Sequence, residues 1–201
     1  RFGTEIAWGT NTGKVFSYGI AGSVQQEELG DPTYQLKTGF TYKPTDRFSL
    51  DFDLNYRRRH NWMVYQGARR VTGFNADEFK PKIALDVFLS AKQQLRFILQ
   101  WAGIKADERE LFQVPLGDGD LIPWIRDPAD ISVDDFTLSR LTAQLRYRWE
   151  IAPLSDLFVV FTRGSNVPDR VDDSFDRLFR DALTDPVIDL FVVKLRYRFG
   201  N

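Results

Sequence analysis

The sequence predicts an all-β protein, an antiparallel transmembrane β-barrel of the outer-membrane type, from three observations. Apolar and polar residues alternate through many segments, which is the period of a strand with one apolar and one polar face. The connections between these segments alternate between short and long, as the periplasmic turns and outward loops of such barrels do. Aromatic residues gather near both ends of the segments, as in the aromatic girdles at the two interfaces of a membrane.

The composition narrows the class of protein further. The 201 residues are 43% hydrophobic, which is enough for one folded domain and excludes a mainly disordered chain. The net charge of −1 gives no overall attraction to nucleic acid. The chain has no cysteine, which excludes thiol nucleophiles, disulfides and Cys-based zinc sites. No apolar run approaches the roughly 20 residues of a spanning helix, whereas a spanning strand needs only about 9–11.

The strands follow from the alternation, which is most regular at residues 48–57, where apolar and polar positions follow each other without error. Strands of any protein favour aromatic residues, so the alternative interpretation is that the aromatic residues reflect strand propensity and not membrane girdles. Nine strands are expected, at residues 2–9, 14–25, 33–43, 47–57, 79–89, 94–104, 139–151, 157–163 and 187–199. The aromatic residues lie near the short turns (Trp8, Phe16, Tyr42, Phe48, Trp149, Tyr197 and Phe199) or near the long loops (Tyr34, Tyr56, Trp62 and Trp101).

The connections set the orientation of the predicted barrel. Short turns are expected at residues 10–13, 44–46, 90–93 and 152–156, and longer loops at 26–32, 58–78, 105–138 and 164–186. This order places the C-terminus at the periplasmic end. Single-chain bacterial barrels have even strand numbers, so nine strands predict a larger barrel with an odd number of strands before Arg1. Residues 1–201 are therefore interpreted as the C-terminal portion of a single barrel domain.

Three stretches carry a resemblance to a known family: "LSRLTAQLRYRWEIAPLSDLFVVFTRG", "RDALTDPVIDLFVVKLRYRFG" and, less sharply, "DLNYRRRHNWMVYQG". They resemble the C-terminal barrel of an uncharacterised proteobacterial family, in which a carbohydrate-binding module resembling family 9 precedes an outer-membrane β-barrel. The resemblance spans most of residues 47–200. It implies location in the outer membrane of a Gram-negative bacterium and a periplasmic carbohydrate-binding domain in the same polypeptide. No sugar-binding residue of that module lies in this chain.

Charged residues line the predicted inward face. The near-repeat of "QLRYRWEI" and "KLRYRFGN" places arginines from two strands at the same depth. The charges could guide an anionic or polar solute, or they could pair into a neutral filling, which their near-equal numbers favour. The candidate lumen cations are Arg96, Arg146, Arg148, Lys194, Arg196 and Arg198, with Lys80 and Lys82, and the candidate acidic partners are Asp51, Asp53, Asp86 and Glu150.

A second group of arginines flanks "HNWMVYQG" in the expected loop 58–78. The arginine fork suits phosphate, and on the outer surface lipopolysaccharide carries phosphates; a solubilising rim is the alternative. The candidate phosphate contacts are Arg57, Arg58, Arg59, Arg69 and Arg70. The acidic loop at 105–135 is expected to be solvated, because its "GDGD" lacks the spacing of a calcium loop. We therefore expect no metal site and no cofactor.

One short helix is expected in an outward loop, near residues 174–184. Phe175, Leu178, Phe179 and Ala182 recur at helical spacing, Asp173 or Ser174 could cap the start, and Pro186 follows the end. The next inward positions, Ile188, Leu190 and Val192, are apolar. We therefore expect the helix to fold into the barrel mouth, pack on these residues and narrow the passage, or otherwise to rest on the rim or a neighbour.

The predicted function is that of a porin-like channel, translocation or anchoring platform for a polar, carbohydrate-related solute. Its expected partners are outer-membrane lipid, lipopolysaccharide and the barrel assembly machinery, reached through a C-terminal strand with alternate Leu195, Tyr197 and Phe199. The first alternative is an outer-membrane hydrolase using loop residues such as His60, although no nucleophile motif accompanies this single histidine and no catalytic residue is assigned. The second is a soluble lipocalin-like barrel with its apolar face turned inward.

Overall fold

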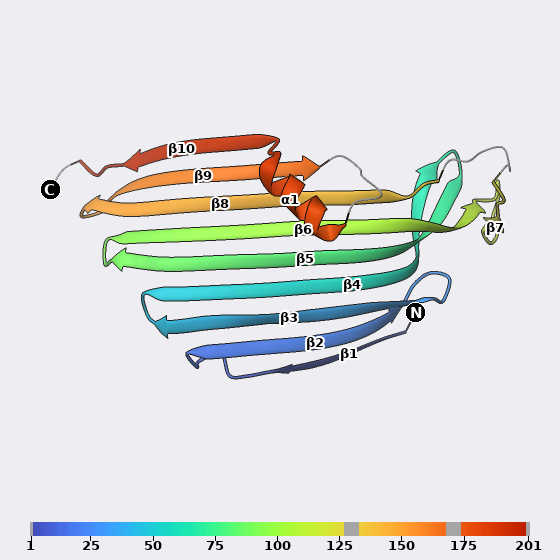
Figure 1. Cartoon of the computed structure of the whole chain (residues 1–201), viewed down its shortest axis with the longest axis horizontal. Coiled ribbons are helices and arrows are strands. Elements are labelled where there is room, and N and C mark those ends of the chain that lie inside the picture. The colour runs from blue at the N-terminus through green and yellow to red at the C-terminus, as the bar shows by residue number, and fades with distance from the viewer. Residues whose placement is uncertain (1, 127–132, 168–173, 200–201) are drawn as a thin grey trace.

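The computed structural model describes residues 2–126, 133–167 and 174–199, which form one antiparallel sheet carrying one helix (Figure 1). The strands neighbour one another in the order β1-β2-β3-β4-β5-β6-β8-β9-β10, and β7 pairs with β6. The bounds are β1 Gly3–Gly9, β2 Phe16–Gln26, β3 Pro32–Thr45, β4 Phe48–Gly67, β5 Arg70–Ser90, β6 Gln93–Gln113, β7 Ile122–Pro123, β8 Phe136–Ala152, β9 Ser155–Val167, α1 Phe175–Thr184 and β10 Ile188–Arg196. The all-β class, the antiparallel order and the helix are confirmed.

The expected long loop at 58–78 is wrong, because β4 and β5 continue through it as a hairpin. The connection is a tight turn at Ala68 and Arg69, with φ of 46° and 66°. Hairpin turns with positive φ usually use Asn-Gly, Asp-Gly or Gly-Gly, so the pair Ala-Arg gave no turn signal. The loop at 105–138 is likewise shorter than expected, since β6 runs to Gln113 and β8 begins at Phe136.

The register of the sheet separates an apolar face from a polar one. Neighbouring strands pair so that one row of directly opposed residues is apolar across eight strands. One residue further along each strand, the side chains point to the other face. The apolar row is Phe16, Tyr42, Leu50, Leu85, Phe97, Leu145, Phe161 and Phe191.

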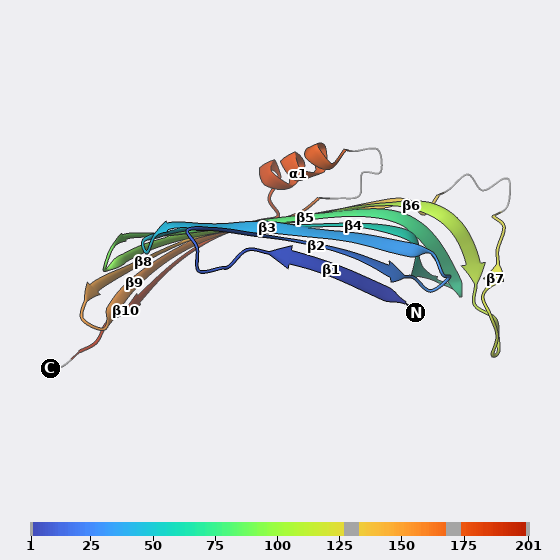
Figure 2. The same cartoon turned by 90° about the horizontal axis from the view of Figure 1, so that it is seen from below.

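The sheet is curved and open. Figure 2 shows the sheet arched, with α1 on its convex side. Because α1 packs on Trp101 and Leu141, which belong to the apolar face, the apolar face is the convex one. The two edge strands, β1 and β10, do not pair with each other, so the chain alone does not close into a barrel. Among the described residues, no helix is long and apolar enough to cross a membrane.

In the part of the chain that the structure describes, most buried apolar residues belong to two small clusters. One lies beneath α1, and the other lies at the long-loop end of β4, β5, β6 and β8. In the second cluster, Phe74, Ala76 and Ala106 are buried against Trp62 and Phe136. A register irregularity between Arg59 and Trp62 turns Trp62 to the concave side, so it does not join the expected outer girdle. Most other apolar side chains of the sheet are exposed or only half-buried.

Candidate functional site on the concave face

The charged residues predicted for the inward face do lie together on the concave face. The register opposes Arg96 to Asp86 on one side and to Arg146 on the other, and the next positions along β8 and β10 carry Arg148 and Lys194. Asp51, Asp53 and Glu150 share this face, as do Lys80 and Lys82, and Arg198 follows the end of β10. The turn end of β6, β8, β9 and β10 thus forms a cationic corner, defined by Arg96, Arg146, Arg148, Lys194 and Arg196.

Asp156 organises this corner, although the sequence assigned it to a turn. The residue is 1% exposed. Its Oδ1 accepts from Arg148 Nε and Nη2, both at 3.0 Å, and its Oδ2 accepts from Arg196 Nη2. The neighbouring Ser155 hydroxyl accepts from the backbone N–H of Arg198 at 3.0 Å. The alternation that places Phe158 on the concave face places Asp156 there too, two residues earlier. A predicted strand that began at Ser155 would therefore have included this carboxylate.

Replacing Asp156 with asparagine is expected to destabilise the sheet, because Arg148 and Arg196 lose the charge of their shared acceptor. Denaturant unfolding of the full-length protein in detergent measures the loss. Asp86→Asn is the matched control, since Asp86 Oδ1 accepts only from Gln94 Nε2 at 2.7 Å among the contacts of the described chain. Equal losses in the two variants would contradict the organising role of Asp156.

The other three cations of the corner have no close counter-ion. Among the described residues, no carboxylate lies within 4.0 Å of the charged groups of Arg96, Arg146 or Lys194. Arg146 Nη2 donates instead to Gln144 Oε1 at 3.3 Å. The expected neutral pairing therefore holds for part of the corner and fails for the rest.

A polar hollow of about 730 Å³ adjoins the corner at the short-turn end of the sheet. Asp51, Asp86 and Arg96 line it, together with the turns at 12–15 and 43–46. Thr41 Oγ1 and Ser49 Oγ donate to Asp51 at 2.6 and 3.1 Å. A second hollow of about 650 Å³ lies along β1 to β5, where Lys82 Nζ lies 3.7 Å from Asp53 Oδ2. The concave face is thus hollowed both at the short-turn end and along β1 to β5.

The five arginines proposed for lipopolysaccharide do not gather in one cluster. Arg57 and Arg59 point to the concave face, and Arg58 to the convex face, because β4 continues through the expected loop. The Arg59 Nε lies 2.7 Å from Oε1 of the buried Glu78, and its guanidinium lies 4.6 Å from the Trp62 ring centroid. Lys80 Nζ contacts the other oxygen of Glu78 at 2.5 Å.

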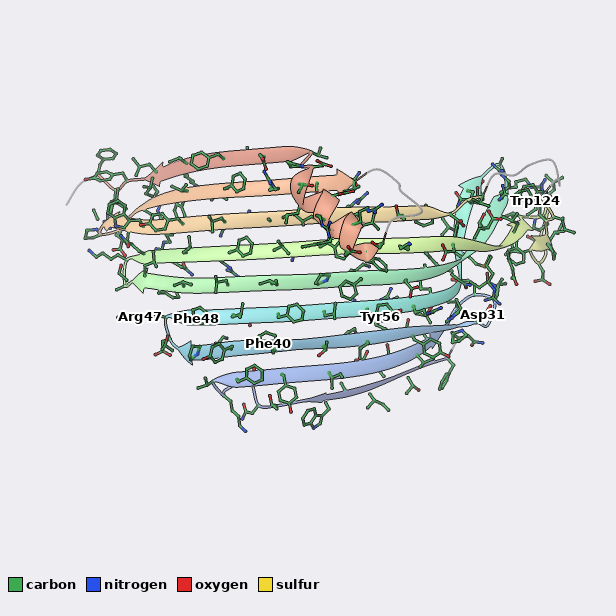
Figure 3. The ribbon with its side chains drawn as sticks, in the orientation of Figure 1. Asp31, Phe40, Arg47, Phe48, Tyr56 and Trp124 are labelled. Atoms are coloured by element: carbon green, nitrogen blue, oxygen red, sulfur yellow. The ribbon has the colours of Figure 1, made fainter. Side chains whose placement is uncertain are left out.

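The remaining two arginines lie at the end of the hairpin. Arg69 is in the turn, and its guanidinium donates to the carbonyl of Val114. Arg70 lies 5.8 Å from the ring centroid of Trp124, which Figure 3 marks near β7. These contacts fasten the loop after β6 to the hairpin. The five arginines thus lie at separate places, and their contact with lipopolysaccharide phosphate stays a prediction.

His60 has a structural contact. Its Nδ1 lies 2.9 Å from the carbonyl oxygen of Pro32, to which it can donate, and its ring meets Tyr34 edge-on at 5.8 Å. Within the described residues, no group of three or more His, Cys, Asp or Glu side chains could hold a metal ion. These observations give the hydrolase alternative no support.

Part of the acidic loop is tied to the sheet, contrary to the expected solvated loop. Glu108 Oε2 accepts from the backbone N–H of Asp134 at 2.8 Å and from Arg126. Thr72 Oγ1 donates to Asp134 Oδ2 at 2.9 Å, and Asp135 Oδ1 accepts from the Glu108 N–H. Two more of its acidic residues, Asp127 and Asp130, lie outside the described residues.

The helix α1 lies on the convex face, so the expected packing of Phe175, Leu178 and Phe179 on the inward positions after the helix is wrong. Leu178 is fully buried against a patch of Trp101, Leu141 and Val167. In contrast, Ile188, Leu190 and Val192 lie on the concave face, where they are 54%, 48% and 42% exposed. The apolar stripe of α1 meets a larger apolar surface on the convex side, which explains the difference.

Polar contacts fix α1 in this position. Trp101 Nε1 donates to Ser139 Oγ at 2.9 Å, and Ser139 Oγ donates to the Leu178 carbonyl at 2.8 Å. Gly103 leaves room for the rings, since a Cβ there would lie 2.5 Å from Trp101 and 3.1 Å from Phe175. At the start of the helix, the Ser174 hydroxyl donates to Asp176 and lowers the pKa of that carboxyl below its usual value. The other suggested cap, Asp173, lies outside the described residues.

The fold and the site define a class of protein: a curved antiparallel β-sheet with an exposed apolar convex face and a charged concave face. Residues 1–199 match the family described as Domain of unknown function (DUF5916), and the chain belongs to this family. Neither the curated proteins nor the solved structures contain a significant match to the chain.

Proposed function

We propose that this chain forms part of the wall of an outer-membrane β-barrel in a Gram-negative bacterium, with its convex face toward lipid and its concave face toward an aqueous lumen. The observation that carries the proposal is the apolar row across eight strands, whose side chains remain exposed or only half-buried although the sheet is formed. Soluble monomers rarely expose contiguous apolar patches larger than a few hundred Å². A lipid environment removes the cost of this surface.

The height of the apolar face supports the same conclusion. On β4 the apolar face extends over nine residues, from Phe48 to Tyr56. Figure 3 labels these two residues, and Arg47 lies just beyond Phe48. At the other end the next residue on this face is Arg58, opposite Asp77. Transmembrane strands need about 9–11 residues. Charged residues therefore limit the apolar face at a spacing that suits one bilayer.

The open edges of the sheet support a larger barrel. Unpaired backbone groups cannot face lipid, so only a closed sheet can span the hydrocarbon core. We propose that further strands complete the barrel beyond β1 and β10. The exposed Leu195, Tyr197 and Phe199 near the C-terminus fit contact with lipid and with the barrel assembly machinery.

The charged concave face favours a channel, translocation or anchoring platform for a polar solute. A carbohydrate-related solute and a carbohydrate-binding domain in the same polypeptide rest on the family resemblance of the sequence alone. The lipocalin-like alternative needs an apolar concave face, whereas the curvature in Figure 2 places the apolar face on the convex side.

Cell fractionation of the full-length protein in a Gram-negative host tests this function. The protein is expected in the outer-membrane fraction, to need detergent for extraction, and to migrate differently on gels before and after heating, as closed barrels do. Reconstitution into planar bilayers should then give stepwise conductance. A protein that is soluble without detergent would refute the membrane proposal, and a membrane-inserted barrel without conductance would limit the function to anchoring.

A further inference from the structure

We propose that the cationic corner binds solutes that carry phosphate or carboxylate groups, and that it makes the lumen selective for anions. Binding of such solutes requires only the concave face described above, whereas anion selectivity rests on the proposed channel function. The unpaired members, Arg96, Arg146 and Lys194, supply the charge, and the two arginines held by Asp156 complete the site.

The pairing of β6 with β8 places directly opposite each other two arginines that have no close counter-ion among the described residues. Arg96 and Arg146 are directly opposed in the register, and both side chains are exposed on the concave face. Directly opposed residues of antiparallel strands have Cβ atoms about 4.5–5.5 Å apart, and like charges in such a pair are destabilising. An anion bound between them removes this repulsion and is held by two arginine forks.

The carboxylates of the corner do not neutralise it. Five cations, Arg96, Arg146, Arg148, Lys194 and Arg196, stand against three carboxylates, Asp86, Glu150 and Asp156. Asp156 uses both of its oxygens on Arg148 and Arg196, and Asp86 accepts from Gln94. The corner therefore keeps a positive charge that a solute can meet.

Asp156 also gives the site a fixed wall. It anchors Arg148 from β8 and Arg196 from β10 across β9, so these two guanidinium groups lose less conformational freedom when a ligand binds. Their side chains remain 47% and 62% exposed, and can still donate to a ligand. Rings of arginine and lysine are the usual means by which pores select anions or phosphate.

Calorimetric titration of the full-length protein in detergent with inorganic pyrophosphate tests the site without any need for conductance. The wild-type protein is expected to bind, and the double variant Arg96→Gln/Arg146→Gln to bind at least ten-fold more weakly. Arg140→Gln is the matched control, because Arg140 lies on the same face of β8 beyond the corner, bonded to Asn166. The control should keep its affinity within two-fold. Absent binding, or equal binding in the double variant, would overturn the site.

Reversal potentials in a KCl gradient test the selectivity separately. The wild-type channel is expected to prefer chloride, and Arg96→Glu/Arg146→Glu to shift the reversal potential toward cation preference, with a smaller shift for Arg140→Glu. An unchanged reversal potential in a conducting barrel overturns the selectivity while leaving the barrel itself intact. Pyrophosphate binding without conductance supports the site and contradicts the channel function instead.

Discussion

Replacing Leu145 with arginine is expected to prevent assembly of the protein into membranes. Leu145 lies midway along the apolar stretch of β8, in the apolar row, and its side chain is 41% exposed. In water, an arginine at such an exposed position would cost little, since surface substitutions usually change stability by less than 0.5 kcal/mol. At the middle of a bilayer the same change costs about 2–4 kcal/mol. The yield of heat-modifiable protein in the outer-membrane fraction measures the effect.

The matched control for this variant is Gln144→Arg. Gln144 is the preceding residue, on the concave face, where its amide donates to Thr162 Oγ1 at 3.2 Å. In the proposed barrel this position faces water, so the control should assemble at near wild-type yield. Normal assembly of Leu145→Arg, or equal loss in both variants, would contradict a lipid-facing convex surface.

Truncation of Leu178 to alanine is expected to release α1 from the sheet. Leu178 is the fully buried centre of the contact with Trp101, Leu141 and Val167. Leucine-to-alanine changes at such sites cost about 2–5 kcal/mol. Because a ten-residue helix is marginal without tertiary packing, we expect it to unfold locally, not merely to shift. Trypsin cleavage after Arg177 and Arg180 should then become at least ten-fold faster.

The control for the helix is Leu183→Ala. Leu183 lies on the same helix but is 39% exposed, so its truncation should leave the cleavage rate within two-fold of wild type. Rapid cleavage of the wild-type helix would contradict the docked position on the convex face. Equally slow trypsin cleavage of the Leu178→Ala and wild-type proteins would also contradict it.

The docked helix also contacts a charged pair on the apolar face. Arg163 and Asp189 are directly opposed there and form two hydrogen bonds of 2.8 and 2.7 Å. Arg163 Nη1 also donates to the carbonyl of Leu183 at the end of α1. The pair is thus satisfied internally and joined to the helix, which in the proposed barrel would reduce the cost of charges beside lipid.

The strand order and the two faces could be predicted from the sequence, because a period of two fixes which side chains share a face. Residues 48–57 illustrate this, since Leu50, Phe52 and Tyr56 align with apolar partners on both β3 and β5. The prediction of the connections failed where the sequence contains no local turn signal. The Ala68–Arg69 turn lacks the usual residues, so a hairpin was read as a loop. The total number of barrel strands stays a prediction.

The site shows the same limit. The alternation placed the charged residues predicted for the lumen on one face of the sheet, but it does not indicate which of these side chains contact one another. Asp156 was missed because strand β9 begins two residues earlier than its apolar run. The helix was recognised from its spacing, yet its side of the sheet depends on Trp101, Ser139 and Gly103, which lie more than 30 residues away. Contacts at that separation have no local signature.

Single cysteines placed along β8 test the central claim most directly, because the chain has no cysteine of its own. In the full-length protein in liposomes, an environment-sensitive fluorophore at position 145, 147 or 149 should be quenched by spin-labelled lipid. The same fluorophore at 144, 146 or 148 should be quenched only by a water-soluble agent. This period of two is the result we predict for a barrel wall. Quenching by the water-soluble agent alone at all six positions would contradict contact between the convex face and lipid.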